Sequence, residues 1–274
     1  MCEPVSELPA QEVGVTTPEG ARDAPSVVTV VGTELSRLWR KFPLWMTLGL
    51  PLALVLPHGL IALLSPEGRQ GQVWEVWLQI VLMFWGVFLP MAAALYAAVS
   101  MRQDDDARQL LYSYAFPRSR LLLGKYFALA TMGLVSAVLL TCLLSLLAVV
   151  FGASDDLARV VAGGLVPWFA ALGTLALCLV VANVWGFTAT VCTGVAGMMF
   201  GALLADKVVW WVIPLAWPMR VVVPIAGIEA SGVPLPEDHP LHDMGVLPIA
   251  AGLSLTLAAV LLAVGSRYVN RKEL

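Results

Sequence analysis

The sequence is poor in charge: 13% of its 274 residues are Asp, Glu, Lys or Arg, whereas 59% are hydrophobic. Soluble domains carry about 25% charged residues, so this composition excludes an ordinary soluble protein and indicates a chain that lies largely in lipid. The mean hydropathy of +0.83 agrees. Because the formal net charge is −3, we do not expect nucleic acid to be a partner.

Motifs for catalysis and metal binding are absent from the sequence. The four cysteines form no C-x-x-C pair and have no histidine at metal-ligand spacing, so we expect small hydrophobic side chains and no metal site. A Gly-Lys pair occurs once, at Gly124 and Lys125, but Ser119 and Tyr126 stand where a phosphate-binding loop needs Gly and Ser or Thr. There is no G-x-S-x-G or H-E-x-x-H motif. We therefore expect no catalytic residue, no cofactor and no ATPase activity of its own.

Six long runs contain no Asp, Glu, Lys or Arg, and each reaches the roughly 20 residues that a helix needs to cross a bilayer. They predict an all-α polytopic membrane protein with six transmembrane helices, although Pro51 and Pro57 interrupt the first run and only residues 183–185 separate the fourth from the fifth. The runs are 44–64, 76–99, 126–150, 160–182, 186–204 and 246–264. Residues 1–32 are rich in Glu, Pro, Thr and Gly, and we expect a disordered cytoplasmic tail followed by one membrane domain over 33–274.

Lysine and arginine set the expected orientation, because cytoplasmic loops carry an excess of them. With both termini in the cytoplasm, twelve of the 16 basic residues lie inside, and Arg69, Arg159, Lys207 and Arg220 lie outside. The apolar segment 208–228 carries Arg220 and three prolines, so we expect a re-entrant or interfacial outer element with Trp210, Trp211 and Trp217 at headgroup depth. The spans hold one histidine, His58, and no other ionisable group that could carry protons or ions, which disfavours a secondary transporter.

Two amphipathic helices are predicted on the cytoplasmic side. In residues 33–42, capped by Thr33, apolar side chains recur at helical spacing and polar ones lie opposite, which is typical of a helix in the membrane interface. The residues that we assign to it are Glu34, Arg37, Trp39, Arg40 and Lys41. Residues 102–116 form the second, with Asp104 as cap and Pro117 as stop; its apolar face can pack on a partner or on the ends of its own spans.

The stretch from Tyr96 through the triple aspartate 104–106, Leu110, Leu111 and the Pro-Arg-Ser-Arg turn 117–120 to Lys125 resembles the cytoplasmic signature of ABC-2 type permeases, the membrane subunits of ATP-driven exporters. Glu34, Arg37 and Lys41, Pro51, and the Trp77, Trp85 and Pro90 series are most similar to the lantibiotic self-immunity branch. Aspartates stand where the family more often has Glu, and Ala107 stands where a Gly is common. The resemblance covers 33–150 best.

This resemblance implies an exporter permease in a bacterial plasma membrane, with a separate cytosolic ATPase, a second permease subunit and an amphipathic peptide antibiotic as cargo. It also implies that 104–116 is the coupling helix that docks on the ATPase. The residues concerned are Asp104, Asp105, Asp106, Leu110, Leu111, Tyr114, Pro117 and Arg118. A non-transporting membrane assembly protein remains the alternative, because it requires no motif.

Small side chains recur every fourth residue in the fifth run, which allows helix backbones to approach closely. We expect this stripe to pack helices within one subunit, with contact to a second permease subunit as the alternative. Its members are Ala189, Thr193, Gly197, Gly201 and Ala205.

Overall fold

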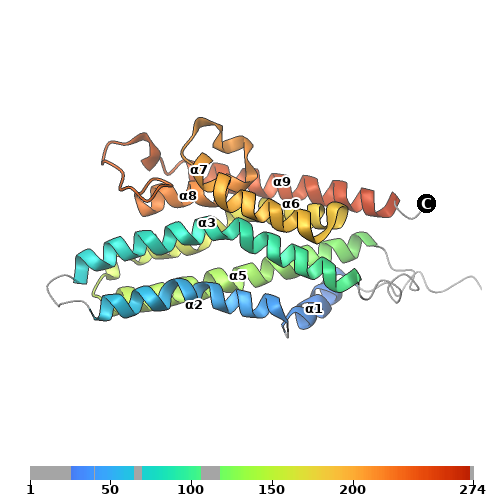
Figure 1. The fold of residues 1–274 in the computed structure, drawn as a ribbon, viewed down its shortest axis with the longest axis horizontal. Helices are drawn as coiled ribbons and strands as arrows, with labels where there is room; N and C mark the ends of the chain where they lie inside the picture. The colour runs from blue at the N-terminus through green and yellow to red at the C-terminus, as the bar shows by residue number, and fades with distance from the viewer. Residues whose placement is uncertain (1–25, 40, 65–69, 106–117, 272–274) are drawn as a thin grey trace, which may run out of the picture.

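The computed structural model describes residues 26–39, 41–64, 70–105 and 118–271. Long helices run side by side along one axis (Figure 1). The α-helices are α1 (Val27–Leu38), α2 (Phe42–Leu63), α3 (Gln70–Asp105), α5 (Arg118–Val150), α6 (Leu157–Ala196), α7 (Ala202–Leu204), α8 (Trp217–Ala226) and α9 (Val246–Arg271). Short 3-10 and π turns join them: η3 (Ser154–Asp156), η4 (Gly197–Gly201), η5 (Val208–Val212), η6 (Pro214–Ala216) and η7 (Pro240–His242).

Among these residues, five helices are long and apolar enough to cross a membrane. They cover Phe42–Ile61, Gly71–Gln103, Ser119–Val150, Ser154–Leu204 and Val246–Tyr268. Five of the six charge-free runs therefore fall entirely in these helices, and the first, 44–64, does so as far as residue 61; the fourth and fifth runs share one helix. The structure therefore has five such helices among the described residues, whereas six transmembrane helices are predicted from the sequence.

The fourth and fifth runs are nevertheless two arms, because the chain reverses direction at Gly186. This residue has φ 82° and ψ −168°, inside what is otherwise continuous helix. Along α3, the first arm meets Trp85 through a hydrogen bond from its indole Nε1 to the Gly164 carbonyl (3.1 Å). After the turn, the guanidinium carbon of Arg102 in α3 lies over the Phe187 ring, 5.5 Å from its centroid. From there the second arm runs back along α3. A positive φ of this size favours glycine, which explains how so short a link suffices.

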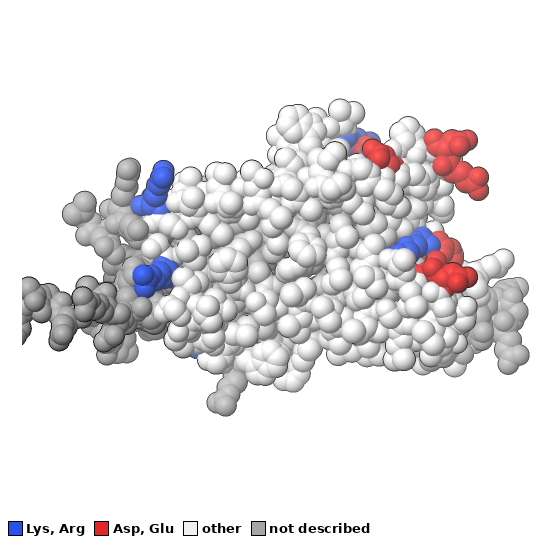
Figure 2. All heavy atoms as spheres, turned by 180° about the vertical axis from the view of Figure 1, so that it is seen from behind, with Lys and Arg blue, Asp and Glu red and all other residues white. Residues whose placement is uncertain are grey.

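Charge divides the bundle into two ends. Arg102 is in the last turn of α3, Arg120 is in the first turn of α5 and Arg267 is near the end of α9, so these side chains lie at what we call the basic end. At the opposite, acidic end, Glu75 lies near the beginning of α3, and Asp156 directly precedes α6. Figure 2 shows on one face that charged groups gather at the two ends and leave an uncharged band between them. A band without charge is what the hydrocarbon core of a membrane requires.

Helix α8 packs inside the bundle near the acidic end. All ten of its residues are buried, and its first residue, Trp217, packs against Gly173 in the first arm of α6. The Thr174 hydroxyl donates to the Pro214 carbonyl (2.8 Å), which places η6 beside the same turn of α6. Trp217 thus lies against the body of the bundle rather than at an exposed rim, whereas Trp211 keeps 57% of its surface exposed. The predicted position of these tryptophans at headgroup depth stays a prediction.

Helix α1 begins earlier than the sequence predicts. Ser26 is its N-cap, with the Ser26 hydroxyl accepting from the Thr29 amide (3.2 Å), so residues 27–32 are helical and are not part of a tail. Thr33 lies inside the helix, where its hydroxyl donates to the Val30 carbonyl, and it caps nothing. The helix ends at Leu38, and α2 begins at Phe42.

Candidate functional site

A buried ion pair joins α1 to the bundle at the basic end. The Lys125 ammonium lies 3.1 Å from Glu34 Oε2 and donates to the Ser100 hydroxyl at 3.3 Å. The side chain of Lys125 is 2% exposed and that of Glu34 6% exposed. Arg37 reaches the other carboxylate oxygen of Glu34 at 3.1 Å and is itself partly exposed. We call Glu34, Lys125 and Ser100 the α1 clamp.

Local packing explains why the α1 clamp can form. Val30, Glu34 and Leu38 follow one another at four-residue spacing, so they share one face of α1, and all three are buried. Val30 lies directly on Gly124, where any Cβ would collide with it. The Gly-Lys pair of α5 therefore has two separate uses: Gly124 lets α1 approach, and Lys125 neutralises the carboxylate that arrives with it. A buried charge requires such a partner, because desolvation is costly.

Glu34 is predicted on the polar face of the interfacial helix 33–42, and this assignment is wrong, because Glu34 is buried. The periodicity of Leu35, Leu38 and Trp39 suggested an apolar arc that excluded Glu34, but Trp39 is 51% exposed and Glu34 faces α5 instead. A signal was available: Glu34 is the only acid in a segment with three basic residues, and it stands four positions from both Val30 and Leu38. A lone acid in such a position favours a specific cationic partner.

The α1 clamp lies on both sides of the predicted coupling segment in the chain. Ser100 is near the end of α3, and Lys125 is near the beginning of α5. Residues 106–117 connect these helices and lie outside the described part of the chain, as do Asp106, Leu110, Leu111, Tyr114 and Pro117 among the predicted coupling residues. Asp104 and Asp105 are in the last turn of α3, and Arg118 begins α5.

Of the other interfacial residues, Lys41 is exposed between α1 and α2, and Arg40 is outside the described residues. Trp39 directly follows α1 and, with half its surface exposed, is placed to contact an interface. Arg37, in the last turn of α1, and Lys41, between α1 and α2, thus add two basic side chains to the basic end.

The small-residue stripe of the second arm packs within this chain. A Cβ on Gly197 would lie 2.7 Å from Pro90 Cβ of α3, and one on Gly201 would collide with the Leu215 carbonyl of η6. The π turn η4 spans these two glycines. Thr193 is partly buried and bonds to its own helix at the Ala189 carbonyl (2.9 Å). In this structure α3 and η6 therefore occupy the space beside these two glycines.

At the acidic end, Arg159 fixes α8 by its C-terminus. Its Nε donates to the Ile225 carbonyl (2.8 Å) and its Nη2 to the Ala226 carbonyl (2.6 Å), two of the groups that the end of a helix leaves unpaired. Its Nη1 binds Glu75 at 2.9 Å. One guanidinium thus joins α3, α6 and α8, which a residue count in loops could not reveal.

Arg220 is the most unusual charge in the described residues. It is 5% exposed in the middle of the apolar helix α8, and its Nε and Nη1 have no hydrogen-bond partner among those residues. Its guanidinium stacks over Trp210, 5.7 Å from the ring centroid. Asp206, just beyond α7, accepts from the Ala230 amide (2.8 Å), and burial raises the pKa of this carboxyl while the nearby Arg220 opposes the shift.

Comparison with known proteins gives one match. A family model described as "ABC-2 family transporter protein" matches residues 30–205, well over half of the chain. Neither the curated proteins nor the solved structures contain a match. The matched range begins in α1 and ends just before Asp206, so it includes the α1 clamp and both arms of α6.

Proposed function

The chain belongs to the ABC-2 transporter family, and we propose that it is the membrane-spanning permease subunit of an ATP-binding-cassette exporter powered by a separate cytosolic ATPase. Membership makes it a multi-pass membrane protein and a component of transport rather than an enzyme in its own right.

The α1 clamp is the observation that carries the proposal. A docked ATPase would act on residues 104–118, and any displacement there reaches the bundle through the adjoining ends of α3 and α5. Ser100 and Lys125 lie on those ends; the Lys125 ammonium binds the buried Glu34 carboxylate of α1 and donates to the Ser100 hydroxyl, so one side chain links all three helices. Since removal of one partner from a buried pair is costly, α1 should move together with the two helices rather than separate from them.

The topology belongs to the same proposal. The reversal at Gly186 supports six membrane crossings, with the two arms of α6 as the fourth and fifth. The basic end then faces the cytoplasm together with both termini, by the excess of Lys and Arg there. Thiol labelling of a cysteine-free variant in intact cells tests this arrangement. A cysteine at exposed Ser231 should react with an impermeant reagent and one at Ser119 should not; the opposite pattern would overturn the orientation.

The proposed cargo and assembly follow from the family resemblance. An amphipathic peptide antibiotic follows from the resemblance to the lantibiotic self-immunity branch, and a bacterial plasma membrane follows with it. A second permease subunit would complete the transporter. Because Gly197 and Gly201 are occupied within the chain, such a subunit would have to use another surface.

Coupling is tested by charge placed on the predicted docking face. The double variant Leu111→Asp with Tyr114→Asp should abolish copurification with the proposed ATPase subunit, because an unpaired charge in a desolvated contact costs several kcal/mol. Gln109→Asp adds a charge to the polar face of the same predicted helix and should leave binding intact. Full binding by the double variant would refute the docking face. Loss of the double variant from the membrane fraction would indicate that this face packs on the bundle instead.

A further inference from the structure

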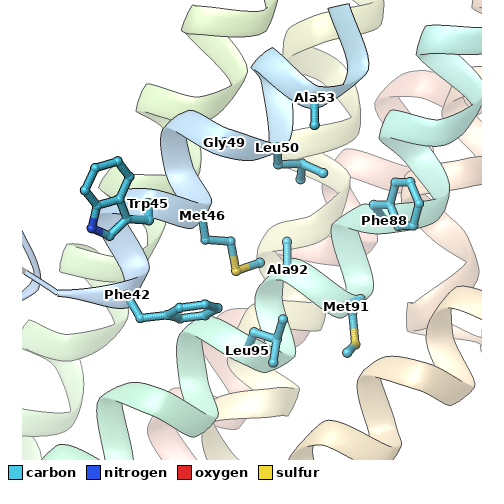
Figure 3. Close-up of a pocket in the computed structure, with 10 residues that line it drawn as sticks. All are labelled: Phe42, Trp45, Met46, Gly49, Leu50, Ala53, Phe88, Met91, Ala92 and Leu95. Atoms are coloured by element: carbon cyan, nitrogen blue, oxygen red, sulfur yellow. The ribbon is translucent and has the colours of Figure 1, made fainter. Parts of the chain in front are cut away.

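An apolar groove separates α2 from α3 on the side of the basic end. Its volume is about 420 Å³, and ten side chains or backbone positions of the two helices line it. Figure 3 shows Phe42, Met46 and Leu50 of α2 opposite Leu95 and other residues of α3. The small residues Gly49, Ala53 and Ala92 supply the depth, since bulkier side chains there would fill it.

The groove is part of the folded bundle rather than a gap between loose helices. Beside it, the hydroxyl groups of Thr47 and Tyr96 form a hydrogen bond of 2.7 Å, and both residues are buried. This bond ties α2 to α3 next to the groove. Further along, Leu54 and Val55 of α2 belong to the main core cluster. The two walls are therefore held at both ends.

The lining selects a hydrocarbon chain. Sites for polar small molecules combine an apolar wall with a few placed polar groups. Here the side chains facing the groove are aliphatic, thioether or phenyl, and Trp45 stands at its rim with 74% of its surface exposed. From Phe42 to Ala53 the groove follows eleven helical steps, about 17 Å, which is close to half of the roughly 30 Å hydrocarbon thickness. One acyl chain of one leaflet matches both the chemistry and this length.

Charge at the mouth indicates the headgroup. The groove begins at Phe42, and the exposed Lys41 directly precedes it. Arg37 is one turn further back and partly exposed. A cationic side chain at this depth attracts anionic lipid headgroups, and the exposed indole of Trp45 suits the same interface.

We infer that the α2–α3 groove is a binding site for a single acyl chain of an anionic phospholipid in the leaflet at the basic end, with its phosphate near Lys41. This site lies outside the predicted coupling residues and does not depend on the transport function proposed above. It would make an anionic lipid a component of the folded permease.

Two matched glycine variants test the chain-binding half. A Cβ at Gly49 meets nothing within 4 Å, and the same holds for Gly252 on α9, so a side chain can begin at either position without a backbone collision. The full chain in nanodiscs containing phosphatidylglycerol with a photoreactive acyl chain should be labelled within residues 42–53 and 88–95. In Gly49→Leu the new side chain occupies part of the groove and should reduce this labelling about tenfold. A tenfold loss corresponds to about two methylenes of the acyl chain losing apolar contact. Gly252→Leu should not change it. Equal labelling of wild type and Gly49→Leu, or labelling spread evenly over all lipid-facing helices, would refute the site.

Lysine variants test the headgroup half. Wild type should prefer labelled phosphatidylglycerol to phosphatidylcholine, Lys41→Gln should lose the preference, and Lys207→Gln, exposed at the other end, should keep it. An unchanged preference in Lys41→Gln would overturn the assignment of the headgroup. Disulfide cross-linking between two copies through Ala53→Cys would overturn the lipid as occupant, because it would place a second copy of the chain on the groove.

Discussion

Removal of either charge of the α1 clamp should destabilise the protein, and removal of both should not. Glu34→Met removes the carboxylate that lies 3.1 Å from the Lys125 ammonium, whose side chain is 2% exposed. Breaking a buried pair in this way costs about 3–5 kcal/mol. Lys125→Met should cost less, because Glu34 keeps Arg37 at 3.1 Å on its other oxygen. The double variant replaces both charges by apolar groups of similar size, which is often neutral.

The measurement is the free energy of unfolding in mixed detergent and SDS micelles, followed by circular dichroism. Arg37→Ala is the control, since its partly exposed pair should contribute at most about 1 kcal/mol. If the proposed coupling is also right, the stable double variant should still bind its ATPase but transport poorly. Single variants that each cost less than about 1 kcal/mol, or a double variant as unstable as the sum of the singles, would refute the reasoning.

Further predictions concern the acidic end and the glycines. Arg159→Leu should lower the free energy of unfolding by about 2–4 kcal/mol, because two helix-terminal carbonyls and Glu75 lose a charged donor; Arg159→Lys should restore only part of it. Asp206 has a raised pKa in the folded state, so folding favours its protonated form, and stability should fall as pH rises through that pKa; a pH series of unfolding should lose this slope in Asp206→Asn. Gly201→Ala should destabilise by about 1–3 kcal/mol through collision with the Leu215 backbone, whereas Gly252→Ala, which meets nothing within 4 Å, should stabilise by up to about 1 kcal/mol; the same unfolding assay compares them.

The sequence predicts the membrane segments well because lipid exposure imposes a simple rule on composition. Five of the six charge-free runs fall entirely within long apolar helices, and the first does so as far as residue 61. Their connections follow other rules. Residues 27–32 are mainly valine, threonine and glycine, poor helix formers in isolation, yet the packing of Val30 on Gly124 holds them in α1. Hydropathy likewise shows that 208–228 is apolar, but it does not reveal that α8 is buried on every side.

Polar partners were the hardest features to predict. Glu34, Lys125 and Ser100 are far apart in sequence, and nothing in their local patterns specifies that they meet. Arg159 and Arg220 were counted as outer-loop charges, but one closes the end of α8 and the other lies within it. A count of loop charges orients a chain in the membrane, whereas pairing depends on tertiary contacts that composition does not encode.

The turn at Gly186 also bears on how the chain is made. Val184, Trp185 and Phe187 around it are apolar and 37–69% exposed, so the turn itself is suited to the membrane boundary rather than to water. Because the turn between the two arms is short and apolar, it gives the membrane-insertion machinery no polar loop that could be retained on one side of the membrane. Its two arms should therefore enter the bilayer together as one unit, and an epitope or protease site inserted between Trp185 and Phe187 should block insertion of the whole 157–204 hairpin.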